Sequence, residues 1–109
     1  MFDLQTMVSS REMRERVEPR VRHLVADHLA VDRHTLGNRV SMRDDLAADS
    51  LDMVELALLL EGEFGVLVSD RAVGAMRSYG DVVDGVLRLI AARATGAGLP
   101  GNPRLERVS

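Results

Sequence analysis

Cysteine, lysine and tryptophan are absent from this chain of 109 residues, and only Phe2, Phe64 and Tyr79 are aromatic. Without cysteine the chain has no disulfide, no thiolate metal ligand and no cysteine nucleophile. So few aromatic side chains argue against a surface that stacks the bases of single-stranded nucleic acid, and they predict an aliphatic core. No apolar run approaches the roughly 20 residues that span a membrane. The N-terminal sequence MFDLQTMVSS lacks the features of a secretory signal, so we expect a cytoplasmic location.

Charge is distributed unevenly along the chain. The formal net charge is −3, and all fourteen basic residues are arginines. Residues 44–70 contain eight acidic residues and no basic one, whereas residues 1–43 and 71–109 carry net charges of +2 and +3. The acidic middle would repel nucleic-acid phosphates. A strongly acidic surface instead favours the association of basic protein partners.

Apolar residues recur at steps of three and four, a pattern typical of helices that bury one face. The fold class we expect is all-α, a four-helix bundle with a long first loop and a short third helix. The expected helices cover about 10–29, Asp49 or Ser50 to 62–65, 70–76, and a last segment from just after Ser78 to about 93. We expect a tail at 1–8, one domain at 9–93, and a disordered tail rich in glycine and proline at 94–109.

The first helix contains two local signals. Ser9 and Glu12 match a capping box, in which each side chain accepts a hydrogen bond from an N–H group at the start of the helix. Pro19 lies in the middle of the segment, where we expect it either to kink the helix or to delay its firm start.

The connection over residues 30–48 is unusually long for a compact domain, which indicates a function. Its apolar residues are expected to hold the loop on the core. They are Val31, Leu36, Val40, Met42 and Leu46.

The second helix is apolar over much of its circumference. We expect one side to be buried and the other to be available for contact. The expected buried residues are Leu56, Leu59, Leu60 and Phe64. Leu51, Val54 and Leu58 fall toward the other side, next to acidic residues.

Ser50 lies where this helix is expected to start. A phosphate on its hydroxyl would face free backbone N–H groups and the positive end of the helix dipole. A plain N-cap, which contributes about 1 kcal/mol, is the simpler interpretation. A catalytic nucleophile would need a base nearby, and the three histidines form no recognisable triad with Ser50. The histidines also lack the i, i+4 spacing of paired helical metal ligands, so we expect no catalytic residue, no metal and no enzymatic activity.

Residues 45–56, DLAADSLDMVEL, resemble the attachment motif of acyl carrier proteins. Residues 60–65, LEGEFG, resemble the end of that family's second helix, and residues 79–83, YGDVV, resemble the start of its last helix. The similarity covers about residues 10–93.

The resemblance implies an acyl-carrier-like bundle in which Ser50 bears covalent 4′-phosphopantetheine, whose thiol holds acyl groups as thioesters. It implies a monomer that takes part in fatty-acid, polyketide or related biosynthesis. The first implied partner is a phosphopantetheinyl transferase. The later partners are acyl transferases, ketosynthases or acyl-activating ligases with basic docking patches. Neither nucleic acid nor membrane is an expected partner. The implied docking residues are Asp49, Leu51, Asp52, Val54, Glu55, Leu58 and Glu61.

Several residues depart from the family pattern. Ala47 replaces the usual glycine, which is tolerable unless that position needs a positive φ. Gly62, Arg71 and Ala72 stand where acidic residues are common, which favours a carrier dedicated to one pathway. Two alternatives stay open: a carrier of aminoacyl or peptidyl groups, and an unmodified helical module that binds a partner groove. We also expect the interior to shelter an acyl chain among Leu46, Leu56, Leu60, Phe64, Val68, Val83 and Leu87.

Overall fold

A computed structural model describes residues 10–95 of the chain. Within that range the fold is all-α, as expected, and contains no strand. Some expectations fall outside the described residues. These are the cap at Ser9, the tail at 1–8, and the tail at 94–109 except for its first two residues. In order, the elements are α2 (Ser10–Leu29), the 3-10 helix η1 (Arg33–Thr35), α3 (Ser50–Phe64), α4 (Asp70–Gly74) and α5 (Tyr79–Thr95).

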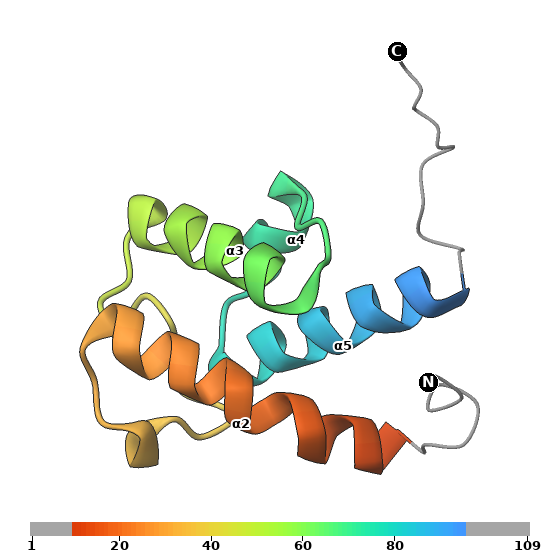
Figure 1. Cartoon of the computed structure of the whole chain (residues 1–109). Helices are drawn as coiled ribbons and strands as arrows, with labels where there is room; N and C mark the ends of the chain where they lie inside the picture. The colour runs from red at the N-terminus through yellow and green to blue at the C-terminus, as the bar shows by residue number, and fades with distance from the viewer. Residues whose placement is uncertain (1–9, 96–109) are drawn as a thin grey trace.

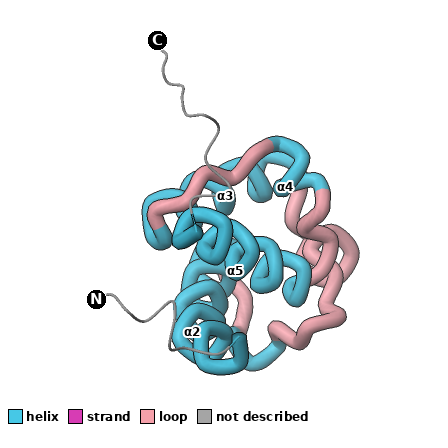
Figure 2. Tube along the Cα trace, turned by 90° about the vertical axis from the view of Figure 1, so that its right-hand side faces the viewer, coloured by secondary structure: helices cyan, strands magenta, loops and turns pink. Residues whose placement is uncertain are grey.

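The three long helices form the body of the molecule. Helix α2 contacts both α3 and α5, and the short α4 contacts α3. Figure 1 shows α5 lying along one part of α2 and α3 above another part of it, with α4 next to α3. Figure 2 shows that the chain between the helices runs mostly along one edge of this arrangement. No helix in the described part of the chain is long and apolar enough to cross a membrane.

Helix α2 is continuous through Pro19, whose ring is exposed on the outer side. The opposite face buries Val17, Val21 and Val25 against the other helices, so packing holds the segment helical across the missing N–H. The helix ends in a Schellman motif, in which the N–H of Val31 donates to the carbonyl of Ala26 at 3.0 Å. This motif requires a left-handed residue, and Ala30 supplies it with φ of 56°.

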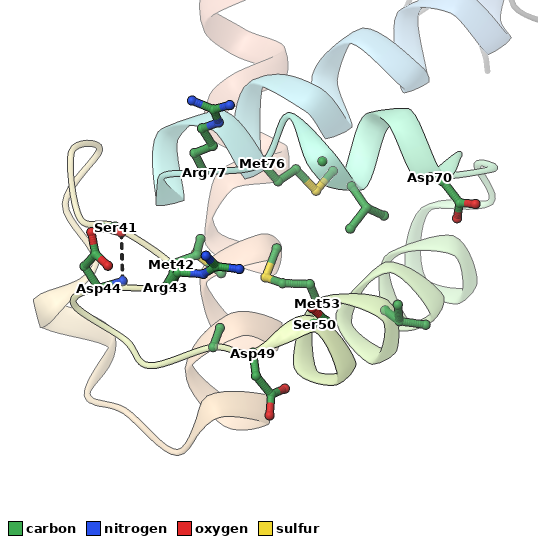
Figure 3. Close-up of a pocket in the computed structure, with 14 residues that line it drawn as sticks. Ser41, Met42, Arg43, Asp44, Asp49, Ser50, Met53, Asp70, Met76 and Arg77 are labelled. Carbon is green, nitrogen blue, oxygen red and sulfur yellow. Dashed lines mark hydrogen bonds between the residues drawn. The ribbon is translucent and has the colours of Figure 1, made fainter.

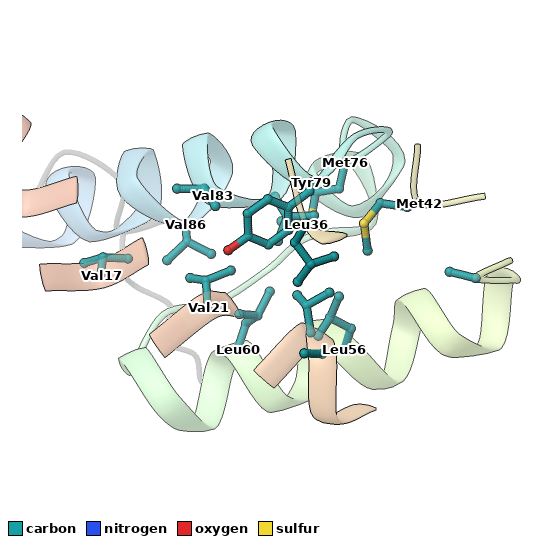
Figure 4. Packing of buried hydrophobic residues seen from close by; sticks show 14 residues of the cluster. Val17, Val21, Leu36, Met42, Leu56, Leu60, Met76, Tyr79, Val83 and Val86 are labelled. Carbon is teal, nitrogen blue, oxygen red and sulfur yellow. The ribbon is translucent and has the colours of Figure 1, made fainter. Parts of the chain in front are cut away.

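The core is aliphatic apart from Tyr79, as Figure 4 shows. Helix α3 buries Leu56, Ala57 and Leu60. The prediction for Leu59 was wrong, because its side chain is 42% exposed. Leu59 precedes Leu60 by one residue and so points about 100° away around the helix. Ala57, which was not assigned to the core, is buried.

The long first loop is held on the core, as expected. Leu36 and Met42 are fully buried, and the other apolar loop residues pack against the core. Backbone hydrogen bonds tie the loop to the start of α5: the N–H of Met42 donates to Arg77, and the N–H of Tyr79 donates to Val40, both at 2.8 Å. These bonds flank an isolated antiparallel bridge between Ser41 and Ser78.

Tyr79 has the only aromatic side chain in the core cluster. Its hydroxyl donates to the Glu18 carboxylate at 2.6 Å, and Arg22 pairs with the same carboxylate at 2.8 Å. The Arg22 guanidinium also lies 5.2 Å from the centre of the Tyr79 ring. Burial, and then the hydrogen bond to Glu18, raise the pKa of the Tyr79 hydroxyl well above its ordinary value.

We expect Tyr79→Phe to lower the free energy of unfolding by about 1–2 kcal/mol, because a buried hydrogen bond to a charged group is lost. The wild type should also lose stability above about pH 10, where the unfolded tyrosine releases its proton and the folded one keeps it. The slope should approach 1.4 kcal/mol per pH unit, at about 25 °C. Urea unfolding between pH 8 and about 11.5 measures both effects.

The same series in Tyr79→Phe is the control for the alkaline effect. The chain has no lysine and no cysteine, so no other side chain titrates near pH 10. A variant that loses stability over this range as steeply as the wild type would show that Tyr79 is not responsible.

Candidate functional site

The start of α3 is fixed by a reciprocal capping box. The carboxylate of Asp49 accepts from the N–H of Asp52 at 2.8 Å, and the carboxylate of Asp52 accepts from the N–H of Asp49 at 3.0 Å. The N-cap of α3 is therefore Asp49, and the simpler interpretation of Ser50 as the cap was wrong. Ser50 is the first helical residue and its side chain is exposed. Its hydroxyl is consequently available for modification without loss of the cap.

The turn before the cap requires a left-handed residue. Ala47 has φ of 57°, the region that glycine occupies without strain. The next residue, Ala48, is buried, and its N–H donates to the carbonyl of Met42 at 2.8 Å. Two residues later the chain presents Ser50 to solvent. Position 47 therefore needs a positive φ, the condition under which alanine is strained there.

A groove of about 620 Å³ opens beside Ser50, between the first loop, α3 and α4. Three methionines lie along it, and Met53 reaches into it from α3 (Figure 3). Figure 3 also shows Arg43 extending from the loop toward Met53. The groove is lined by Met42, Met53, Val54, Val73 and Met76 together with polar residues at its rim.

The expected interior shelter for an acyl chain lies elsewhere. None of its seven residues lines the groove beside Ser50. Leu56, Leu60 and Val83 are packed into the closed core with almost no exposed surface. The space next to Ser50 is instead built from methionines, which are flexible and adapt to different occupants.

The docking residues named from the resemblance lie along the outer side of α3, apart from Asp49, which caps its start. Leu51 is 64% exposed, Val54 49% and Leu58 61%, so these apolar side chains meet solvent. They lie among exposed and half-buried carboxylates of the same helix, and Val54 also lines the groove. Apolar side chains surrounded by acidic ones form a surface suited to a basic, partly apolar partner. The face comprises Asp49, Leu51, Asp52, Val54, Glu55, Leu58 and Glu61.

Two of these carboxylates also have structural roles. Asp52 completes the capping box, and Glu61 accepts a hydrogen bond from the N–H of Val68 at 2.8 Å. That bond holds the segment that leads into α4. In α4 itself, Arg71 follows Asp70, so the acidic surface of α3 does not continue along this helix.

The three histidines occupy different surroundings. His23 is exposed, and His34, in the middle of η1, contacts the capping residue Asp32 at 3.0 Å. The His34 backbone N–H, followed by its side chain, lowers the pKa of Asp32. His28 faces Asp52 and Glu55 across the contact between α2 and α3. Spacing along the sequence could not reveal this group, because its members come from two helices.

Comparisons with known proteins agree with this geometry. The chain matches the phosphopantetheine attachment site family over residues 19–86. Acyl carrier proteins of Sinorhizobium fredii and Rhizobium meliloti are each 45% identical to it over 67 residues, which cover 62% of this chain and 86% of each relative. A solved acyl carrier protein from Enterococcus faecalis aligns with a TM-score of 0.61 and 30% identity, over 70% of this chain and 96% of that one.

Ala47→Gly should raise the free energy of unfolding by about 0.5–1 kcal/mol. Relief of left-handed strain contributes about 1–2 kcal/mol, and the greater freedom of glycine in the unfolded chain offsets about 0.5–1 kcal/mol of it. Chemical denaturation of the two proteins measures the difference.

The matched control is Ala91→Gly, at an exposed position inside α5, which should destabilise by about 1 kcal/mol. If both substitutions destabilise to the same degree, Ala47 is not strained.

Proposed function

The chain belongs to the acyl carrier protein family, and from that premise we propose that Ser50 carries 4′-phosphopantetheine through a phosphodiester and presents acyl groups to biosynthetic enzymes. When attached, the group supplies a thiol, which this cysteine-free chain lacks. One observation supports the proposal most directly. At the start of α3, Asp49 caps the helix and the hydroxyl of Ser50 stays exposed.

The local backbone suits a phosphodiester. The capping box uses the N–H of Asp52, and the first intrahelical bond runs from Met53 to Asp49. The N–H groups of Ser50 and Leu51 therefore remain at the open end of the helix, where the dipole is positive. A negative phosphate on Ser50 is stabilised at this position.

Loading Ser50 needs a base that the transferase supplies. In this reaction the Ser50 oxygen forms a bond to the β-phosphorus of coenzyme A, the pyrophosphate bond breaks, and adenosine 3′,5′-bisphosphate leaves. His28 faces acids of α3, His34 contacts Asp32 and His23 is exposed, so we assign the proton transfer to none of them. The chain thus acts as the substrate of the transferase, and we do not assign it catalysis of its own.

The groove beside Ser50 gives the cargo a place to rest. Its methionine side chains offer apolar surface within reach of the attachment point, and Arg43 lies at its rim. A cytoplasmic carrier of fatty-acyl or polyketide intermediates fits these features. The same attachment chemistry would serve aminoacyl or peptidyl groups, and the thioester recovered from cells distinguishes these cargoes.

We propose that partners dock on the exposed face of α3, because its apolar side chains lie among carboxylates. The partners that we propose are the transferase, followed by acyl transferases, ketosynthases or acyl-activating ligases with basic docking patches. An unmodified interaction module could use the same exposed leucines, so modification of Ser50 is the property that separates the two functions.

Incubation with coenzyme A and a broad-specificity phosphopantetheinyl transferase should add the mass of one phosphopantetheine to the wild-type chain. Ser50→Ala should remain unmodified, because the proposed acceptor oxygen is removed. Intact-protein mass spectrometry followed by peptide mapping measures both results.

Ser69→Ala is the matched control, since Ser69 also stands at the start of a helix, where its hydroxyl caps α4. This variant should be loaded like the wild type. A wild-type chain that stays unmodified with several competent transferases would exclude the carrier function.

Association with the transferase should be sensitive to salt. We expect the association rate to fall by about tenfold or more as the ionic strength rises from 0.01 to 0.5 M, because steering by the acidic face is screened. Glu55→Gln should lower the rate at low salt and flatten this dependence. Stopped-flow fluorescence measures the rates.

Two variants separate charge from apolar contact. Leu58→Ala should speed dissociation and leave the salt dependence unchanged, since it removes buried contact area alone. Glu15→Gln, an exposed acid on α2, should change neither rate. If Glu15→Gln and Glu55→Gln behave alike, net charge rather than the α3 face determines association.

A further inference from the structure

His28, Asp52 and Glu55 converge where the end of α2 meets the start of α3. One potential metal-ligating atom from each residue lies within 4.8 Å of the other two. His28 Nε2 lies 3.5 Å from Glu55 Oε1. The His28 side chain is only 19% exposed, whereas that of Glu55 is 48% exposed. The group is thus a half-buried site with one side open to solvent.

The His28 ring nitrogen supplies an independent observation. Nε2 is buried and has no hydrogen-bond partner, although the Glu55 carboxylate is near. A buried polar atom without a partner is destabilising. Nε2 points toward carboxylates of a neighbouring helix. A cation bound between them would give this nitrogen a partner.

The distances suit a small tetrahedral ion. Two ligand atoms bound to zinc at 2.0–2.2 Å lie about 3.4 Å apart, and the His28–Glu55 separation is already close to that. Asp52 uses Oδ2 for the capping box, so Oδ1 is available as a ligand. Rotation of the exposed Glu55 side chain can bring the three ligand atoms to zinc-binding distance. Water can complete the coordination.

We propose that His28, Asp52 and Glu55 bind a divalent transition-metal ion, with zinc as the favoured ion, and so join α2 to α3 beside the attachment serine. One imidazole with two carboxylates suits zinc better than magnesium, which prefers oxygen ligands alone. His28 lies in the last turn of α2, where the negative end of the helix dipole also favours a cation.

Titration calorimetry with zinc chloride tests the proposal on the full-length Ser50→Ala protein, in which no thiol on an arm can compete for the metal. We expect one zinc ion per chain, and binding weaker by at least about tenfold after His28→Gln or Glu55→Gln. In NMR spectra, zinc should shift the ring signals of His28 and leave those of His34 in place.

His34→Gln is the matched control, because His34 is an exposed histidine that also contacts a carboxylate. It should bind zinc like the parent protein. Equal zinc affinity in the parent, His28→Gln and Glu55→Gln proteins would overturn the proposal, as would magnesium binding with the same strength as zinc. Glu55 is exposed, so its variant gives an answer even if His28→Gln folds poorly. None of these outcomes depends on phosphopantetheine, so the carrier function and the metal site can fail separately.

Discussion

The reciprocal hydrogen bonds between Asp49 and Asp52 are the constraint on which the site depends. They end the long loop and start α3 at a defined residue, and this fixes both the direction of the helix and the place of Ser50. Without them the loop could end one residue later, with Ser50 as the cap. Its hydroxyl would then be engaged by the backbone and would be a poor acceptor for a modifying enzyme. The cap therefore links the local fold directly to the chemistry.

The loop that leads to this cap is equally constrained. Leu36 and Met42 are buried, and the backbone around Met42 is bonded both to Ala48 and to the segment before α5. The chain must turn sharply between these bonds and the cap, and Ala47 makes the turn in the left-handed region. An alanine there stores strain beside the proposed attachment residue. Strain of this kind persists only where the surrounding structure over-determines the backbone.

Much of this architecture could be read from the sequence, for reasons that can be stated. Strong apolar periodicity located α2 and α5. In the structure, reciprocal hydrogen bonds between Ser78 and Asp81 fix the start of α5. The periodicity of α3 was ambiguous because most of its faces are apolar. This is why Leu59 was assigned to the core although it is exposed. The second role of Glu61 and the meeting of His28 with α3 depend on tertiary contacts, which no local pattern encodes.

The composition of the chain gains a chemical meaning once the carrier function is proposed. A thioester is open to attack by thiols and amines, and a nearby lysine or cysteine could remove the cargo. This chain has neither residue, and its fourteen basic side chains are guanidinium groups that stay protonated. Arg43 and Arg77 can therefore line the groove beside Ser50 without acting as nucleophiles. Arginine provides positive charge there without offering the proposed thioester a nucleophilic amine.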